Sequence, residues 1–195
     1  MNASTSPNDS TPASGGARAV LRDATAAQHA RVDDAFPTGL NTPQAYARYL
    51  RGMHRFALDF EHATTRVPRQ SRWLERDLAA VGLQPLMAPW ASPSPLADDD
   101  AVMGWEYVMA GSSLGARVLI RAVHRLGHTG EHGAHFLECQ GTSDDWRQVQ
   151  QRLATVDVAD APRLARMIDG ARSAFTHVAV CLAHGSDSAN EEHAL

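Results

Sequence analysis

The sequence predicts an all-α protein with a single domain of six to eight helices. Apolar residues recur at spacings of three and four along most of the chain, which is the period of an amphipathic helix. No segment shows the strict alternation of a half-buried strand, and no internal repeat is present. A length of 195 residues provides one substantial core and is short for two domains.

The chain begins with a polar segment that is followed by a helix. Residues 1–16 carry almost no bulky apolar side chains, so we expect a disordered tail there. From Ala17 the pattern is helical, and Pro37 ends it. One apolar stripe of this helix is formed by Leu21, Thr25, His29, Val32 and Phe36.

The later helices are predicted from their start and stop signals. Thr42 is a good N-cap, because Pro43 suits the first helical position. The acidic run 98–100 favours another helix start, and four prolines make 85–95 a loop. The predicted helices span residues 17–36, 43–67, 71–81, 100–126, 134–139, 143–155 and 161–184. We therefore expect one helical domain over 17–185 and a flexible tail over 186–195.

The composition excludes several classes of protein. A net charge of −4 gives no general attraction to nucleic acid or to an anionic membrane. No run approaches the ~20 apolar residues of a membrane span, and the N-terminus lacks the features of a secretory signal, so we expect a cytoplasmic protein. Cys139 and Cys181 suggest neither a disulfide framework nor a metal cluster. All eighteen basic residues are arginine, whose planar fork binds carboxylates bidentately.

His29 lies on the apolar stripe of the first predicted helix. A neutral imidazole in that place can coordinate a metal or donate to a buried acceptor. Taken alone, a packing or hydrogen-bonding role is the simpler interpretation, because histidine is often partly buried.

Residues 104–120, GWEYVMAGSSLGARVLI, carry a helix face with few large side chains. Glycine inside a helix costs up to ~1 kcal/mol relative to alanine, so Gly111 and Gly115 indicate a purpose. Either a flat or bulky ligand approaches the backbone there, or another helix packs tightly against it. Ser112 and Ser113 could hydrogen-bond a water or bend the helix by bonding back to a carbonyl.

Other patterns do not indicate a site. The histidines of segment 128–135 have metal-like spacing but no accompanying set of cysteines or carboxylates. Asp59 and His62 form one D-x-x-H pair, whereas a di-iron bundle needs two such pairs and two further acids. No G-x-S-x-G motif, Walker loop or dinucleotide fingerprint is present.

Two segments together resemble the heme oxygenase family. LRDATAAQHARVDDAF, residues 21–36, is similar to the opening helix that carries the proximal histidine in that family. Residues 104–120 resemble the distal helix of the bacterial members. Further similar segments are WLERDLAAVGL (73–83), HFLECQG (135–141) and DGARSAFTHVAV (169–180). The resemblance thus spans about residues 18–184.

The resemblance implies that heme lies between the first helix and a distal helix kinked by glycines. His29 would then be the axial ligand of the heme iron, and Gly111 and Gly115 would let the distal backbone lie against the heme. Ser112 stands where animal members have an acidic residue that organises distal water. Ala116 replaces a further glycine found in many members, which implies a stiffer distal helix.

The resemblance also implies contacts around the heme edge. Arg22 matches a basic residue near a propionate, and Tyr107 matches a tyrosine that reaches a propionate. Arg172 and Phe175 match a basic residue and a heme-contacting aromatic on the last helix. Asp33, one turn after the proximal histidine, is a candidate acceptor for its other ring nitrogen.

The implied activity is that of a biliverdin-producing heme oxygenase. Heme is cofactor and substrate at once, and is cleaved with O2 to biliverdin, iron and CO. The electrons would come from an external reductase or ferredoxin. The implied partners are this redox protein and a photoreceptor that accepts biliverdin, and we expect a monomer that binds neither nucleic acid nor membrane.

Three alternatives stay open at this point. A protein that sequesters heme without cleaving it would keep His29 but would need no open distal pocket. A protein of the same helical architecture that acts on another small cofactor would not need His29. A helical interaction module would leave Gly111 and Gly115 unexplained.

Overall fold

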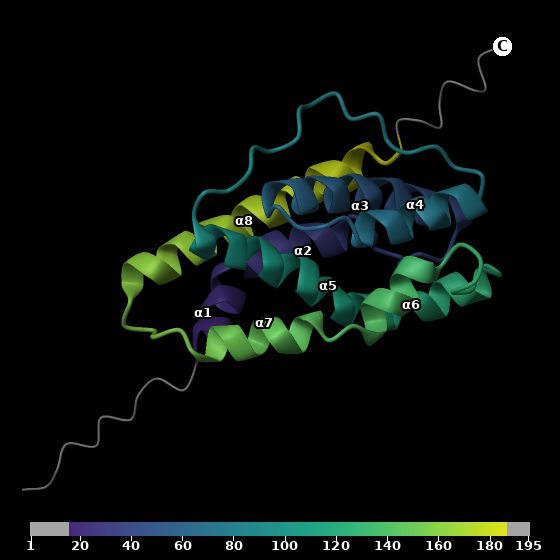
Figure 1. Cartoon of the computed structure of the whole chain (residues 1–195). Coiled ribbons are helices and arrows are strands. Elements are labelled where there is room, and N and C mark those ends of the chain that lie inside the picture. Colours follow the sequence, from purple (N-terminus) through teal and green to yellow (C-terminus); the bar gives the residue numbers. More distant parts are fainter. Residues whose placement is uncertain (1–15, 187–195) are drawn as a thin grey trace, which may run out of the picture.

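A computed structural model describes residues 16–186, and this part of the chain folds into eight α-helices without a β-strand (Figure 1). The all-α prediction is therefore confirmed for that range. The helices are α1 (Ala17–Ala24), α2 (Ala26–Asp34), α3 (Pro43–Ala63), α4 (Gln70–Ala80), α5 (Asp99–Arg125), α6 (His135–Thr142), α7 (Asp145–Ala154) and α8 (Ala161–His184). The tails predicted over 1–16 and 186–195 lie outside the described residues, apart from Gly16 and Ser186. None of the helices within 16–186 combines the length and the apolar character that crossing a bilayer requires.

Side chains just ahead of three helices bind the unpaired amides of the first turn. Thr42 accepts from the amide three residues further on at 3.1 Å, ahead of α3. Asp98 accepts from two amides of α5 at 2.8 and 3.0 Å, and Asp160 accepts from one amide of α8 at 3.1 Å. These caps explain why the helix starts follow from local sequence.

The helix predicted over 17–36 is interrupted at Thr25, which separates α1 from α2. The Thr25 hydroxyl donates to the carbonyl of Leu21 at 2.7 Å, in competition with the backbone ladder. Leu21 and Thr25 are buried, but α2 has no buried residue. His29 itself is exposed, so the packing interpretation of this residue is wrong, although Val32 and Phe36 further along the stripe are partly buried against the core.

Glycines bring α8 into backbone contact with α5 and α3 (Figure 1). A Cβ on Gly104 of α5 would lie 2.3 Å from the carbonyl oxygen of Met167. A Cβ on Gly170 of α8 would lie 2.4 Å from that of Ala101. On the α3 side, a Cβ on Gly52 would lie 2.8 Å from a carbonyl near the end of α8. Tight helix packing is therefore the explanation for Gly104.

Candidate functional site

His29 is on α2, where its ring is held at one nitrogen. Nδ1 lies 2.9 Å from Asp33 Oδ2, one turn further along the helix. Because an ionised carboxylate only accepts, Nδ1 carries the proton and Nε2 presents its lone pair. No side chain within residues 16–186 hydrogen-bonds to Nε2, and 62% of the His29 side chain is exposed. Asp33 thus occupies the place expected of the acceptor, and Nε2 can bind a metal.

Aromatic side chains of α8 and α5 lie beside α1 and α2. Phe175 of α8 packs edge-on against the His29 ring, with 5.7 Å between the ring centroids. Tyr107 of α5 is buried, and its hydroxyl lies near Thr25 and Arg22. Burial raises the pKa of Tyr107, and the nearby Thr25 side chain and the charges of Arg18 and Arg22 offset this only in part. The phenol is therefore protonated at neutral pH and can donate a hydrogen bond.

The face of α5 beyond Tyr107 is uncovered. A Cβ on Gly115 would meet no atom within 4 Å, and one on Gly111 would meet only the ring of Trp146, at 3.7 Å. On the same side of the helix, Val118 is 70% exposed. An apolar strip with accessible backbone is therefore available to a flat ligand, in contrast to the α5 glycine that packs on α8.

The Ser112 hydroxyl is already engaged. It donates to the carbonyl of Met109 at 2.7 Å, which is the back-bonding alternative considered from the sequence. The Gln140 amide donates to the same carbonyl at 2.9 Å and to the Ser112 hydroxyl at 3.1 Å. Ala116 is buried toward Gly141 of α6, so its methyl group points away from the uncovered face.

Arg22 and Arg172 both lie at the junction of α1 and α2. Arg22 is exposed and pairs with its neighbour Asp23 at 2.9 Å. Arg172 of α8 donates from Nε to the carbonyl of Ala24 at 3.2 Å. Two guanidinium groups at this junction can bind the carboxylates of a ligand.

Sequence reasoning missed two residues next to the site. Trp146 of α7 stacks obliquely on Tyr107, with 5.6 Å between the centroids. Gln140 of α6 binds α5 from the side opposite the uncovered face. Neither belongs to a motif, and each contacts α5 across more than twenty residues of sequence. The periodicity of their own helices would have indicated only that they face the protein.

A second cluster of titratable side chains lies between α3 and α8. Asp59 Oδ2 lies 2.7 Å from His177 Nε2, and Cys181 is close enough to complete a set of three potential metal ligands. Arg55, however, donates to both oxygens of Asp59 at 2.7 and 2.8 Å. Burial raises the pKa of Cys181 to about 12, so the thiol stays protonated. We interpret this cluster as a buried ion-pair network.

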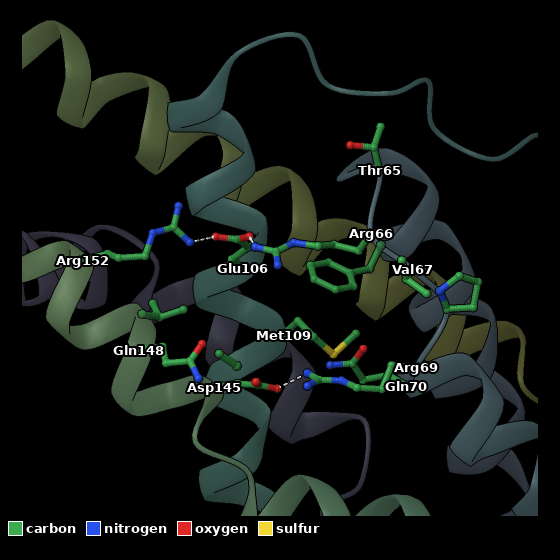
Figure 2. A pocket seen from close by; sticks show the side chains of 14 residues that line it. Thr65, Arg66, Val67, Arg69, Gln70, Glu106, Met109, Asp145, Gln148 and Arg152 are labelled. Atoms are coloured by element: carbon green, nitrogen blue, oxygen red, sulfur yellow. Dashed lines mark hydrogen bonds and ion pairs between the residues drawn. The ribbon is translucent and has the colours of Figure 1, made fainter.

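A pocket of about 630 Å³ opens on another face of α5, between the connector before α4 and α7 (Figure 2). Glu106 pairs there with both Arg66 and Arg152, and Arg69 pairs with Asp145. Two ion-pair bridges therefore cross the pocket. Each of its arginines has a carboxylate partner, and none of the predicted site residues lines it.

Comparison with known proteins finds a relative in sequence and a protein of similar structure, while no protein-family model matches the chain. A heme oxygenase of Xanthomonas campestris pv. campestris (strain 8004) is 32% identical over 150 residues, which are 71% of this chain and 88% of that protein. The structure is also similar to that of the NO- and CO-bound heme oxygenase from Neisseria meningitidis, with a TM-score of 0.71 and 24% identity. This similarity covers 90% of the present chain and 94% of the other, and it supports the fold.

Proposed function

The chain belongs to the heme oxygenase family, and we propose that it binds heme at His29 and cleaves it with O2 and external electrons to biliverdin, iron and CO. One observation of this chain carries the proposal. The His29–Asp33 pair, 2.9 Å apart, fixes the ring tautomer and leaves Nε2 available, while the glycine face of α5 is uncovered. Family membership supports the activity, and this pair supports the assignment of the iron ligand.

The residues around His29 fit a flat, apolar macrocycle with two carboxylates. Phe175 provides an apolar edge at the proximal ring. On α5, Gly111 and Gly115 lack side chains that would hold a ligand away from the backbone. The rim arginines, Arg22 and Arg172, supply planar donors for the propionates. We therefore assign the axial contact to His29, the apolar contacts to Phe175 and the glycine face of α5, and the propionate contacts to the two arginines.

When heme is bound, its iron supplies the activation of oxygen, and the protein binds, orients and excludes water. Asp33 holds the His29 ring in one orientation and increases the basicity of Nε2. With heme held between α2 and α5, the absence of side chains at Gly111 and Gly115 would leave room for a small ligand next to the helix backbone. Tyr107 can donate its phenolic proton to a carboxylate, and together with Arg172 it would fix the in-plane rotation of the ring. That rotation determines which bridge of the macrocycle lies toward the confined side.

Ser112 has a different role from the acid found in animal members. Its proton is held by the carbonyl of Met109, so it is not a proton donor in this arrangement. Protons would then have to arrive through water on the uncovered side of α5. A hydroxyl oxygen that accepts from Gln140 can still help to shape the helix at this point.

The test starts with hemin added to the purified protein and a recording of the Soret band. Wild-type protein is expected to give a six-coordinate His-ligated spectrum and, with ascorbate in air, the broad absorption of biliverdin. His29→Ala should lose the axial ligation, whereas His62→Ala, a matched change on α3, should not. Binding of hemin without any conversion would contradict the enzyme assignment. An unchanged spectrum of His29→Ala would contradict the proposed ligand.

The alternative of a heme-sequestering protein is disfavoured by the uncovered face at Gly111 and Gly115, because sequestration needs no open distal side. We also propose the finer partners inferred from the resemblance: a reductase or ferredoxin as electron donor, and a photoreceptor that accepts biliverdin. A monomer in the cytoplasm and a domain over residues 17–185 belong to the same proposal.

A further inference from the structure

We propose that Gln140 is a positioning residue that anchors α5 at Met109 and Ser112. By doing so it sets how closely the Gly111–Gly115 face approaches the heme. The effect on the heme reaction rests on the proposed function. The anchoring of α5 by Gln140 does not, because it involves only protein atoms. Gln140 touches no part of the uncovered face and acts through the helix backbone.

The Gln140 side chain is completely buried and is held in one orientation. Nε2 donates to the carbonyl of Met109 at 2.9 Å and to the hydroxyl of Ser112 at 3.1 Å. Because a carbonyl only accepts, the amide nitrogen and not the oxygen must face Met109. Oε1 is buried and has no partner among the described residues. The buried amide of Gln140 thus makes two hydrogen bonds to α5 although its oxygen has no partner. Because buried polar atoms are usually satisfied, this orientation indicates a specific role for the two bonds.

The anchored carbonyl of Met109 accepts from more than one side chain. The Met109 carbonyl also accepts from the Ser112 hydroxyl at 2.7 Å. Helical geometry directs the amide of Ser113 at the same oxygen, so several donors share it. Shared carbonyls weaken the helix ladder and permit bending, and two glycines follow within the next two turns. Gln140 therefore supplies two hydrogen bonds from α6 to this part of α5.

The anchor is rigid because α6 is itself held at both ends. At its start, Asp77 of α4 accepts from the amides of His135 and Phe136, both at 2.8 Å. At its end, Arg117 of α5 donates from Nε to the carbonyl of Gly141 at 2.8 Å. α6 thereby connects α4 to the middle of α5 through hydrogen bonds.

Gln140→Met tests the anchoring, since methionine has nearly the same length and removes both polar groups. We expect hydrogen exchange of the backbone amides in 109–116 to rise at least about tenfold, because buried bonds to this segment are lost. Exchange in α8 should stay at the wild-type rate. Gln148→Met, on the exposed side of α7, is the matched control and should change neither segment. Wild-type protection of 109–116, or an equal rise throughout α8, would overturn the proposal.

A measurement on the wild-type protein covers the case in which Gln140→Met does not fold. The side-chain amide protons of Gln140 should exchange slowly and show nuclear Overhauser contacts to Met109 and Ser112. Fast exchange of these protons with water would overturn the anchoring.

The consequence for the reaction is measured on the hemin complex of Gln140→Met. We expect the Soret position of the wild type, because His29 is untouched, and single-turnover conversion with ascorbate slowed by about tenfold or more. Conversion at the wild-type rate despite faster exchange in 109–116 would overturn the positioning role. A wild-type protein that converts no hemin would contradict the proposed function, while the exchange experiment would still decide the anchoring.

Discussion

Replacing Gly104 with alanine introduces a methyl group into the contact between α5 and α8. Its Cβ would lie 2.3 Å from Met167 O, 2.5 Å from Ala171 N and 2.8 Å from Gly170 C. All three are backbone atoms, which cannot rotate away, so the helices must separate. Overpacking of this kind costs roughly 1–3 kcal/mol or more, and the better helix propensity of alanine returns up to ~1 kcal/mol. We expect a net loss of about 2 kcal/mol in the free energy of unfolding, near the upper part of that range.

Thermal unfolding followed by circular dichroism, without hemin, measures this loss. For a domain of this size, about 2 kcal/mol lowers the Tm by roughly 4–8 °C. Gly115→Ala is the matched control, because a Cβ there meets no atom within 4 Å. It should leave the Tm unchanged or raise it slightly, because the better helix propensity of alanine adds up to ~1 kcal/mol to the free energy of unfolding. A Gly104→Ala protein as stable as Gly115→Ala would refute the assignment of the two glycines to different roles.

The remaining predictions concern the site and the buried ion pairs. Gly115→Val should weaken hemin binding at least about tenfold in a fluorescence-quenching titration, because the side chain fills the space proposed for the ligand. The apo-protein should keep its Tm, because a Cβ at this position meets no atom within 4 Å. Unchanged affinity would show that heme lies elsewhere. Asp33→Asn should keep hemin bound but weaken the axial bond, visible as a lower iron–histidine stretching frequency in the ferrous complex; a wild-type frequency would exclude Asp33 as the acceptor. Asp59→Asn should cost about 3–5 kcal/mol in urea unfolding at pH 7, since it leaves Arg55 buried without its partner; a loss below ~1 kcal/mol would indicate a solvent-screened pair. Burial pushes the pKa of Asp59 up, but hydrogen bonds from His177 and Arg55 outweigh it and hold the pKa below the usual 3.8. The stabilisation is therefore present above pH 3.8 and is lost as the pH falls through the lowered pKa, so the wild type and Asp59→Asn should converge in urea midpoint only in that acid range.

The ends of the helices could be predicted from the sequence because their causes are local. Thr42, Asp98 and Asp160 each bind amides no more than three residues away, and composition alone identifies such caps. The break at Thr25 has an equally local cause, yet threonine continues many helices. Whether its hydroxyl competes with the ladder depends on the burial of Leu21 and Thr25 against the rest of the fold.

The roles of the glycines could not be predicted, because their partners are distant in sequence. Gly104 and Gly115 belong to the same helix face in the sequence pattern. The first touches α8, more than sixty residues further along, and the second touches nothing within 4 Å. Tight helix packing explains Gly104, whereas the approach of a ligand to the uncovered Gly115 stays a prediction. Only the packing of α8 separates them.

The candidate site was predicted mainly through the family resemblance. The pattern around His29 indicated a packing residue, and the structure instead shows an exposed ring held by Asp33. Periodicity could not reveal this, since a helix face that awaits a ligand has the same apolar residues as one that packs against protein. Gln140 was missed for a related reason, because a lone glutamine on a short helix has no recognisable signature.

The glycine contacts of α8 have a mechanical consequence. Backbone meets backbone at Gly52 on α3 and at Gly104 on α5, so α8 cannot slide along its axis without separating from both neighbours. Phe175 and Arg172 therefore keep a fixed position along the axis of α8 relative to α3 and α5. Any adjustment as the large planar substrate enters, or as its opened product leaves, falls to α2, which is uncovered, and to α5 beyond Gly111. The last helix therefore provides a fixed surface on one side of the proposed site.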